Sequence, residues 1–313
     1  MTDIQRESLP LCQAPAEHVL THARATFAQN SGAGFRLCFL FDASHHEDGL
    51  RVAHAHAGAT GTTLHNLLTG LPEGDAPEVG FYLLAVDLEH ADELFGYWAA
   101  PQRQPAGLWL WTTWDTPRLA AHLVQFIDIR FGKDQKGILR LADPFVWQAL
   151  AVELHDPVGQ HLVAPVGAYW QGDLDGQWWT VRPESRPDAP MPPVPLQLKP
   201  VVYAALDEAM WPAQIYHALY SERDEEPATG EREAALARIR DEYARARRWG
   251  GADALDFVTF SSLAEAFHTD FDSTPKVQEL LEAAAQRKAK LTATLTSIPP
   301  EVWADVEQRR NTA

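Results

Sequence analysis

A proline-rich segment divides this chain of 313 residues into two parts of different character. Between Arg186 and Pro200, prolines stand at positions 187, 190, 192, 193, 195 and 200. Proline fixes φ and has no amide hydrogen to donate, so this density disfavours both helix and sheet and favours a semi-rigid extended connector. We therefore predict a domain over residues 1–186, a linker over 187–200 and a second domain over 201–313.

The first part alternates apolar runs with segments of helical periodicity. Runs typical of buried strands occupy Phe35–Phe41, Val79–Val86, Gly107–Thr113 and Gly137–Ala142. Proline directly after Thr116 and after Asp143 is typical of a capped helix start. Strands separated by helices predict an α/β (α+β) N-terminal lobe in which a mixed sheet is flanked by helices.

The second part has helical periodicity throughout. Leu236, Ile239, Tyr243 and Ala246 form one apolar stripe, and Thr274 followed by proline opens a further helix. Packing several such stripes together requires a small helical bundle. We expect a smaller all-α C-terminal lobe.

The charge balance limits the classes of partner. Twenty-six basic and 43 acidic residues give a net charge of −17, which disfavours both nucleic acid and anionic lipid surfaces as partners. Only two cysteines are present, Cys12 and Cys38, which fits a reducing compartment. The first residues lack the apolar core of a signal peptide, and we expect a soluble, cytoplasmic protein.

A histidine-rich stretch is the strongest candidate for a metal site. It contains His45, His46, His54 and His56, with Asp48 between the two pairs. On a strand, histidines two positions apart point to the same side, so His54 and His56 are able to share an ion such as zinc. The alternative is a solvated loop, because Gly58–Thr63 reads as an exposed connector. A phosphate-binding loop is disfavoured there, because threonine stands where lysine is required after Gly61.

Tryptophans are the most informative aromatic residues. Trp178 and Trp179 occupy adjacent positions on one strand of a hairpin predicted around Asp175 and Gly176. Adjacent strand residues face opposite sides, so at least one of the two leaves the core unless a second layer covers it. Exposed tryptophan is enriched at interaction surfaces, which makes both residues candidates for partner binding; the alternative is packing under helices.

A short charged motif, Arg140-Leu-Ala-Asp143-Pro144, follows the fourth predicted strand. Asp143 is placed to cap the next helix, and Arg140 to tie the turn to a neighbouring strand. We interpret these residues as structural. No Gly-x-Ser-x-Gly nucleophile motif occurs in the chain, and Cys38 lies within an apolar strand, where a thiol is inert.

These residues stand in an order that resembles a known family. A strand ending in Trp and Thr, Gly107–Trp114, leads into a helix, then the turn Phe131–Lys136, then Gly137–Pro144 with its Arg-x-x-Asp-Pro core. Together with upstream apolar segments, this pattern resembles the domain of unknown function 4123 family over roughly Leu37–Arg182. The first strand departs from the usual form, because a histidine-rich insertion follows Asp42.

The resemblance implies an adaptor, also called an effector chaperone, of bacterial type VI secretion. Such proteins bind a toxic effector in the cytoplasm and help to load it onto the spike-tip valine-glycine repeat protein. The resemblance also implies that the protein is not an enzyme and needs no cofactor. In this reading, the family-motif residues are Arg140, Asp143 and Pro144. The competing hypotheses are a metal-dependent hydrolase on the histidine cluster and a plain interaction module outside secretion.

Overall fold

The chain divides into two compact units, Met1–Ala209 and Met210–Ala313. The computed structural model describes residues 6–8, 16–30, 34–45, 48–99, 107–131, 135–150, 157–175, 178–182, 196–220, 227–228, 230–267 and 270–310. Residues 187–195 of the predicted linker lie outside this part. Residues Leu196–Gln197 form strand β10, and helix α7 begins at Pro200 and ends at Tyr220, so the unit boundary falls inside a helix. The boundaries expected at residues 186 and 200 stay predictions.

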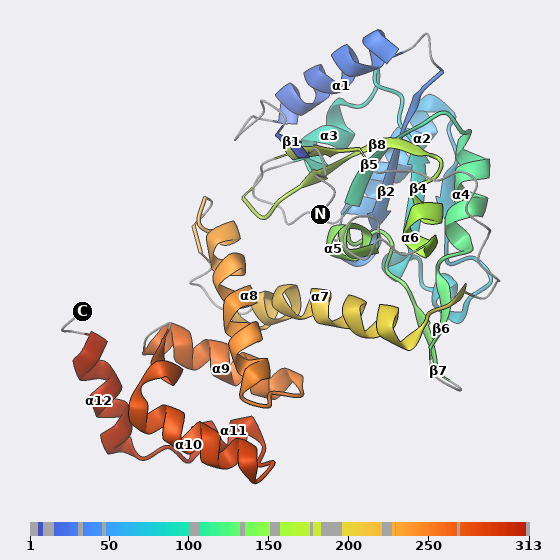
Figure 1. Cartoon of the computed structure of the whole chain (residues 1–313). Helices are drawn as coiled ribbons and strands as arrows, with labels where there is room; N and C mark the ends of the chain where they lie inside the picture. Colours follow the sequence, from blue (N-terminus) through green and yellow to red (C-terminus); the bar gives the residue numbers. More distant parts are fainter. Residues whose placement is uncertain are drawn as a thin grey trace. The chain divides into compact units, whose positions relative to one another are not determined.

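A seven-stranded sheet forms the centre of the first unit, with the strand order β1-β9-β8-β5-β2-β4-β3 (Figure 1). Its strands are β1 (Arg6–Ser8), β2 (Arg36–Asp42), β3 (Leu64–Asn66), β4 (Phe81–Ala85), β5 (Gly107–Thr112), β8 (Val166–Gly172) and β9 (Trp178–Val181). Every neighbouring pair is antiparallel. The predicted hairpin is present as β8 and β9.

A second, three-stranded sheet has the order β10-β6-β7. Its other strands are β6 (Asp128–Phe131) and β7 (Gln135–Ile138). β6 pairs antiparallel with β7 and parallel with β10, so the mixed pairing expected from the sequence occurs in this sheet.

Helices cover both faces of the large sheet. The helices of the first unit that precede α7 are α1 (Ala16–Asn30), α2 (Gly49–Thr60), α3 (Asp92–Trp98), α4 (Thr116–Val124), α5 (Pro144–Gln148) and α6 (Pro157–Leu162), with short 3-10 helices at Ala43–His45, Pro72–Asp75 and Pro77–Val79. Alternate residues of each strand point to opposite faces. On one face Phe39 packs beneath α1, α2 and α3, and on the other Cys38 lies 3.8 Å from Thr116 Oγ1 of α4.

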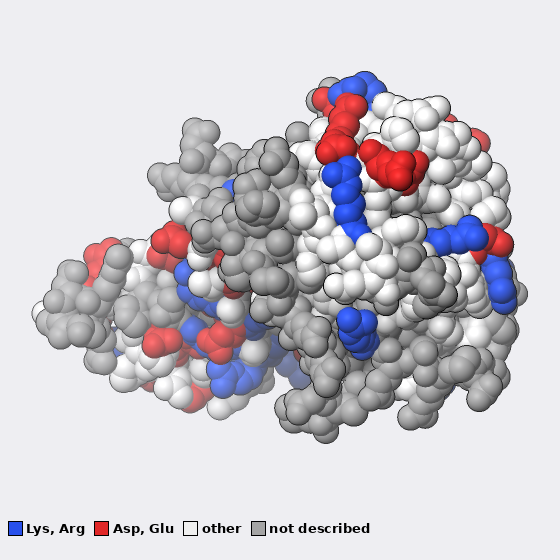
Figure 2. Space-filling view, turned by 90° about the horizontal axis from the view of Figure 1, so that it is seen from above, with Lys and Arg blue, Asp and Glu red and all other residues white. Residues whose placement is uncertain are grey.

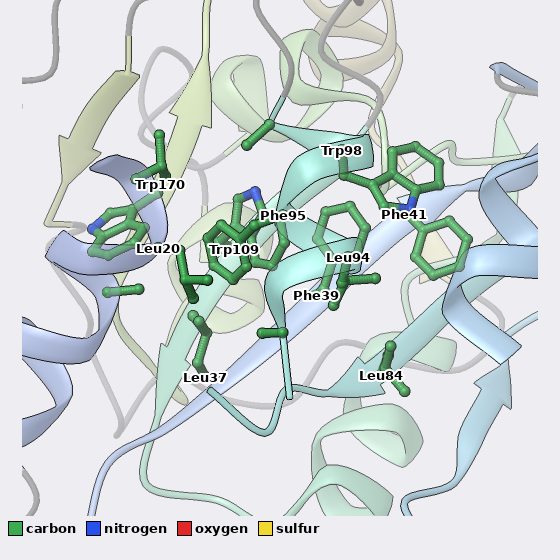
Figure 3. Close-up of a cluster of buried hydrophobic side chains, with 14 of the residues drawn as sticks. Leu20, Leu37, Phe39, Phe41, Leu84, Leu94, Phe95, Trp98, Trp109 and Trp170 are labelled. Carbon is green, nitrogen blue, oxygen red and sulfur yellow. The ribbon is translucent and has the colours of Figure 1, made fainter. Parts of the chain in front are cut away.

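Aromatic rings fill the layer beneath α1, α2 and α3 (Figure 3). The Trp109 ring of β5 is stacked between Phe39 of β2, at 4.2 Å between ring centroids, and Phe95 of α3, at 4.0 Å. Trp98 completes the layer against Phe41 at 4.9 Å. Such pairs contribute about 0.5–1.5 kcal/mol each beyond the burial of their area. These contacts bury the centre of the sheet, where β2 and β5 pair.

The described part of the second unit is helical, and the predicted fold class is confirmed. Beyond the end of α7, it contains α8 (Arg232–Arg248), α9 (Ala254–Ala266), a 3-10 turn (Phe271–Ser273), α10 (Pro275–Gln286), α11 (Leu291–Thr296) and α12 (Pro300–Arg310). Phe257 of α9 joins three helices, because its ring contacts Trp211 of α7 at 4.9 Å and Tyr243 of α8 at 4.8 Å. Among the described helices, none has the length and apolar character needed to cross a membrane.

Candidate functional site

The Arg140 side chain joins the turn before α5 to the end of β2. Its Nη2 donates to the Oδ2 of Asp42 and, at 2.8 Å, to the Oγ of Ser44. Ser44 in turn donates to the Oδ1 of Asp42 from its backbone N–H at 2.9 Å and from its hydroxyl at 2.6 Å. Two segments 98 residues apart in sequence are thereby fixed to one carboxylate.

Burial makes this ion pair asymmetric. The Asp42 side chain is fully buried, whereas the Arg140 side chain is 47% exposed. The guanidinium carbon of Arg140 also lies 5.5 Å from the centre of the Phe81 ring. A buried carboxylate needs donors to offset its lost hydration, and Ser44 and Arg140 supply them. We call this ion pair the Asp42–Arg140 joint. It links two segments of the fold, and its arginine side is partly exposed to solvent.

Asp143 and Pro144 complete the motif at the start of α5. Asp143 is the N-cap residue, its Oδ1 accepts from the backbone N–H of Phe145 at 2.8 Å, and Pro144 follows in the first turn. The backbone N–H of Asp143 also donates to the Arg140 carbonyl at 2.9 Å. The motif therefore shapes one tight turn, from which Arg140 reaches β2. At the start of α4, which a proline also marks, the N-cap residue is Asp115, one position before the predicted Thr116.

The part of the histidine-rich stretch from Gly49 onward is helical, which corrects the exposed loop predicted there and its strand alternative. His54 and His56 both lie on α2, where positions two apart point to nearly opposite sides. His54 is exposed and His56 is buried. Gly61, with φ of 66°, ends the helix as its C-cap, so Gly58–Thr60 belongs to the helix rather than to a connector.

Both ring nitrogens of His56 bond backbone groups. Its Nε2 accepts from the N–H of Asp87 at 3.2 Å, and its Nδ1 donates to the carbonyl of His90 at 3.2 Å. Burial lowers the pKa of His56, which favours this neutral form. Within the described residues, no group of three or more His, Cys, Asp or Glu is placed to hold a metal ion. His46 lies outside the described residues, as does the side chain of His45.

The two tryptophans predicted as partner contacts lie in different surroundings. Trp178 is only 6% exposed and belongs to the core beneath α1, α2 and α3, so its ring offers little surface to a partner. Trp179 is partly exposed, and its Nε1 donates to the Oδ2 of Asp173 at 3.1 Å. Trp178 is covered, as the alternative expected, and partner binding by either tryptophan stays a prediction.

Two buried histidines were not predicted as site residues. His122 of α4 and His161 of α6 lie with their ring centroids 5.5 Å apart, next to Phe126. His122 Nε2 donates to the Leu162 carbonyl at 3.1 Å, and burial lowers the pKa of His122. The sequence signal available was the position of His122 on the buried stripe of α4 between Leu119 and Leu123.

The second unit contains a buried carboxylate of its own. Glu242 of α8 is 1% exposed, and burial raises its pKa to about 7, an effect that Ser261, Arg238 and Arg245 partly offset. The Nε of Arg238 is 3.6 Å from the Oε1 of Glu242. Arg245 is committed elsewhere, because its Nη2 pairs with the buried Asp272.

Charged residues on the outer side of α1, α2 and α3 form ion pairs and do not make a patch of one sign. Arg24 contacts Asp92 at 3.2 Å, and Arg51 contacts Asp48 at 3.1 Å and Glu93 at 4.0 Å. Figure 2 shows the same mixture on the viewed face of the larger body, where red and blue groups adjoin and much of the described surface is uncharged. On the described part of this face, acidic and basic groups therefore occur together.

Comparison with known families supports a single assignment. Residues 39–158 match the family model described as "Domain of unknown function (DUF4123)". The matched range begins in β2, ends in α6 and includes both sides of the Asp42–Arg140 joint as well as Asp143 and Pro144. Comparisons with curated proteins and with solved structures gave no match.

Proposed function

We propose that this protein is an adaptor of type VI secretion, which binds a toxic effector in the cytoplasm and helps to load it onto the spike-tip valine-glycine repeat protein. The match of residues 39–158 to the DUF4123 family carries this proposal. The adaptor role comes from the family resemblance of the sequence, and the matched segment contains all three motif residues, Arg140, Asp143 and Pro144.

The arrangement of the motif supports a role in folding rather than in chemistry. Asp42 is fully buried beneath Arg140, and Asp143 caps a helix. Two further groups also have little scope for chemistry, namely His56 of the histidine cluster and the thiol of Cys38, which was expected to be inert. Both nitrogens of His56 bond backbone groups, and burial raises the pKa of the Cys38 thiol to about 11. These observations favour the adaptor over the metal-dependent hydrolase.

The proposal is tested by identifying the partners of the full chain. The tagged protein is purified from its native host and compared by mass spectrometry with a tag-only control. We expect two specific partners, a protein with toxin activity and the spike-tip protein. The proposal fails if neither is enriched, or if the purified chain carries stoichiometric metal and turns over a substrate by itself.

We further propose that the helical C-terminal part contributes much of the effector specificity. The family match ends at residue 158, so this part lies outside the segment shared with the family. Exchanging Lys199–Ala313 for the equivalent part of a second adaptor should transfer effector choice while spike-tip binding is kept. Because α7 begins at Pro200, the exchange leaves this helix uninterrupted. A chimera that keeps the original effector would contradict the assignment.

A further inference from the structure

The hairpin of β6 and β7 carries two like charges directly opposite each other. Arg130 of β6 and Lys136 of β7 are cross-strand partners, and both side chains are exposed. Like charges at such positions destabilise a sheet. Among the residues that the structure describes, no carboxylate forms an ion pair with either side chain, and this includes Asp128, which lies on the same face. Without an ion-pair partner among the described residues, these two cations are available to an external anionic group, in a chain whose net charge is otherwise −17.

Hydrogen bonding at the ends of the hairpin reveals which backbone groups are free. Leu139 donates its N–H to the carbonyl of Ile127 at 2.9 Å, so this pair is of the hydrogen-bonded type. Hydrogen-bonded and non-hydrogen-bonded pairs alternate along an antiparallel ladder, which makes the Arg130–Lys136 pair non-hydrogen-bonded. Consistently, the Arg130 carbonyl points away from β7 and accepts from the N–H of Leu198 at 2.9 Å.

The same alternation turns the backbone N–H and C=O of Lys136 and Ile138 away from β6. β7 is the last strand of its sheet, and in the described part of the chain no strand pairs with this side of it (Figure 1). An open strand edge is a template for an added strand. The open edge belongs to β7, and the two cations lie on the β6–β7 pair. One extended ligand is therefore able to hydrogen-bond with the edge and to place anionic groups near both cations.

The opposite face of the hairpin is already occupied. Ile129 is buried, and the Phe131 ring stacks on Tyr203 of α7 at 4.1 Å between centroids. This packing holds the hairpin in place and leaves the face of Arg130 and Lys136 outward. Gln197 of β10 is aligned with Arg130 in the next strand, which adds a further exposed amide to that face.

We propose that the open edge of β7 binds an extended acidic segment of a partner protein, which adds to the small sheet as a fourth strand and sets its carboxylates against Arg130 and Lys136. A polypeptide fits better than a nucleic acid, because the edge offers peptide-type hydrogen bonds and the remainder of the chain is strongly acidic. The inference does not depend on whether the partner is secreted.

The full chain is titrated into a short fluorescein-labelled peptide in which glutamate alternates with valine, and binding is followed by fluorescence anisotropy. A lysine–valine peptide is the matched control. We expect Arg130→Glu to weaken binding of the acidic peptide about tenfold at low salt, with a smaller effect at high salt. The same substitution should leave thermal stability unchanged or raise it, because it replaces a repulsive cross-strand pair by an attractive one. Arg240→Glu, an exposed substitution on α8, makes the same charge change elsewhere and should bind like the unaltered chain.

A second variant tests strand addition separately from charge. Ile138→Pro removes an amide donor that faces outward and keeps both cations, so it should weaken peptide binding, whereas Ile138→Ala should not. Circular dichroism checks that the proline variant remains folded. The proposal is overturned if the acidic peptide does not bind, if Arg130→Glu and Arg240→Glu behave alike, if the folded proline variant binds normally, or if single-stranded DNA binds in preference to the peptide.

Discussion

At the scale of single residues, Asp42 is a buried charge whose stability depends on its donors. Arg140→Ala removes the cationic donor and leaves the carboxylate with the two groups of Ser44. Because the Arg140 side chain is 47% exposed, water replaces part of the lost interaction, and we expect a loss of about 1–3 kcal/mol in the free energy of unfolding. Urea denaturation followed by circular dichroism measures it.

The control for this substitution is another arginine that binds no buried charge. Arg118 lies 3.9 Å above the Trp114 ring at the surface, and Arg118→Ala should cost less than Arg140→Ala. Combining Arg140→Ala with Asp42→Asn in a double-mutant cycle should show a coupling of about 0.5–3 kcal/mol. Additive effects of the two substitutions would mean that the joint does not stabilise the fold.

The thiol of Cys38 gives a second prediction at this scale. Burial raises its pKa to about 11, so at pH 8 it is protonated as well as inaccessible. In a Cys12→Ser variant, we expect Ellman's reagent to label no thiol in the native protein and one thiol after denaturation in urea. Labelling of the native variant within the mixing time would show that β2 opens far more readily than its packing indicates.

At the scale of elements, two glycines should respond oppositely to alanine. A Cβ at Gly107 of β5 would lie 2.7 Å from the backbone oxygen of Leu40 and 2.7 Å from the Phe39 ring, so overpacking should cost about 1–3 kcal/mol. A Cβ at Gly58 of α2 meets no atom within 4 Å, and alanine there should add about 0.5–1 kcal/mol because it favours helix. Thermal denaturation of both variants distinguishes the two. A destabilising Gly58→Ala would restore the loop interpretation of this stretch.

Continuous apolar runs made the central strands predictable. The runs at 79–86 and 107–113 contain β4 and β5, and the run at 35–41 covers β2 except for its last residue, Asp42. Most residues of these strands are buried on both faces, so an uninterrupted apolar run was enough to find them. The fourth strand, predicted over residues 137–142, lies earlier in the chain as β7. Leu139 and Ala142 are buried in the turn that follows β7 rather than in a strand. Antiparallel pairing was not predictable, since it depends on how distant strands meet and not on local pattern.

The difference between local pattern and contacts between distant segments also explains which features of the candidate site were predictable. Asp143 as a cap follows from its neighbour Pro144, a local signal. The partner of Arg140 is Asp42, 98 residues away, and its only sequence signal was a carboxylate at the end of an apolar run. The segment around His54 and His56 was misassigned because Gly58 was taken as the mark of a loop. The helical spacing of its apolar residues was the better signal, since Val52, Ala53, His56 and Ala57 all face inward on α2.

At the scale of the whole molecule, two units with separate cores are able to respond differently to pH. Glu242 tests this in the second unit. Its folded pKa is raised from 4.5 to about 7 by burial, so the folded state retains its proton where the unfolded state has lost it. The stabilising effect of the bound proton is fully present below about pH 4.5 and is lost as the pH rises through about 7. Unfolding of this unit should therefore become easier over that interval.

Glu242→Gln isolates this effect from other groups that titrate in the same range. Glutamine cannot ionise, so between pH 5 and 8 the variant should lose less stability than the unaltered chain, by a difference on the order of 1–3 kcal/mol. Glu265→Gln, the exposed carboxylate that accepts from the Tyr220 hydroxyl at 2.9 Å, is the control and should leave most of the pH dependence intact. Hydrogen exchange measured at pH 5 and at pH 8 should show the loss of stability in α8 and α9 but not in β2 and β5. The reason is that the buried carboxylate belongs to the second unit alone. If the slope of stability with pH is identical in Glu242→Gln, the carboxylate is already ionised in the folded protein and Arg238 and Arg245 hold it more strongly than their geometry suggests.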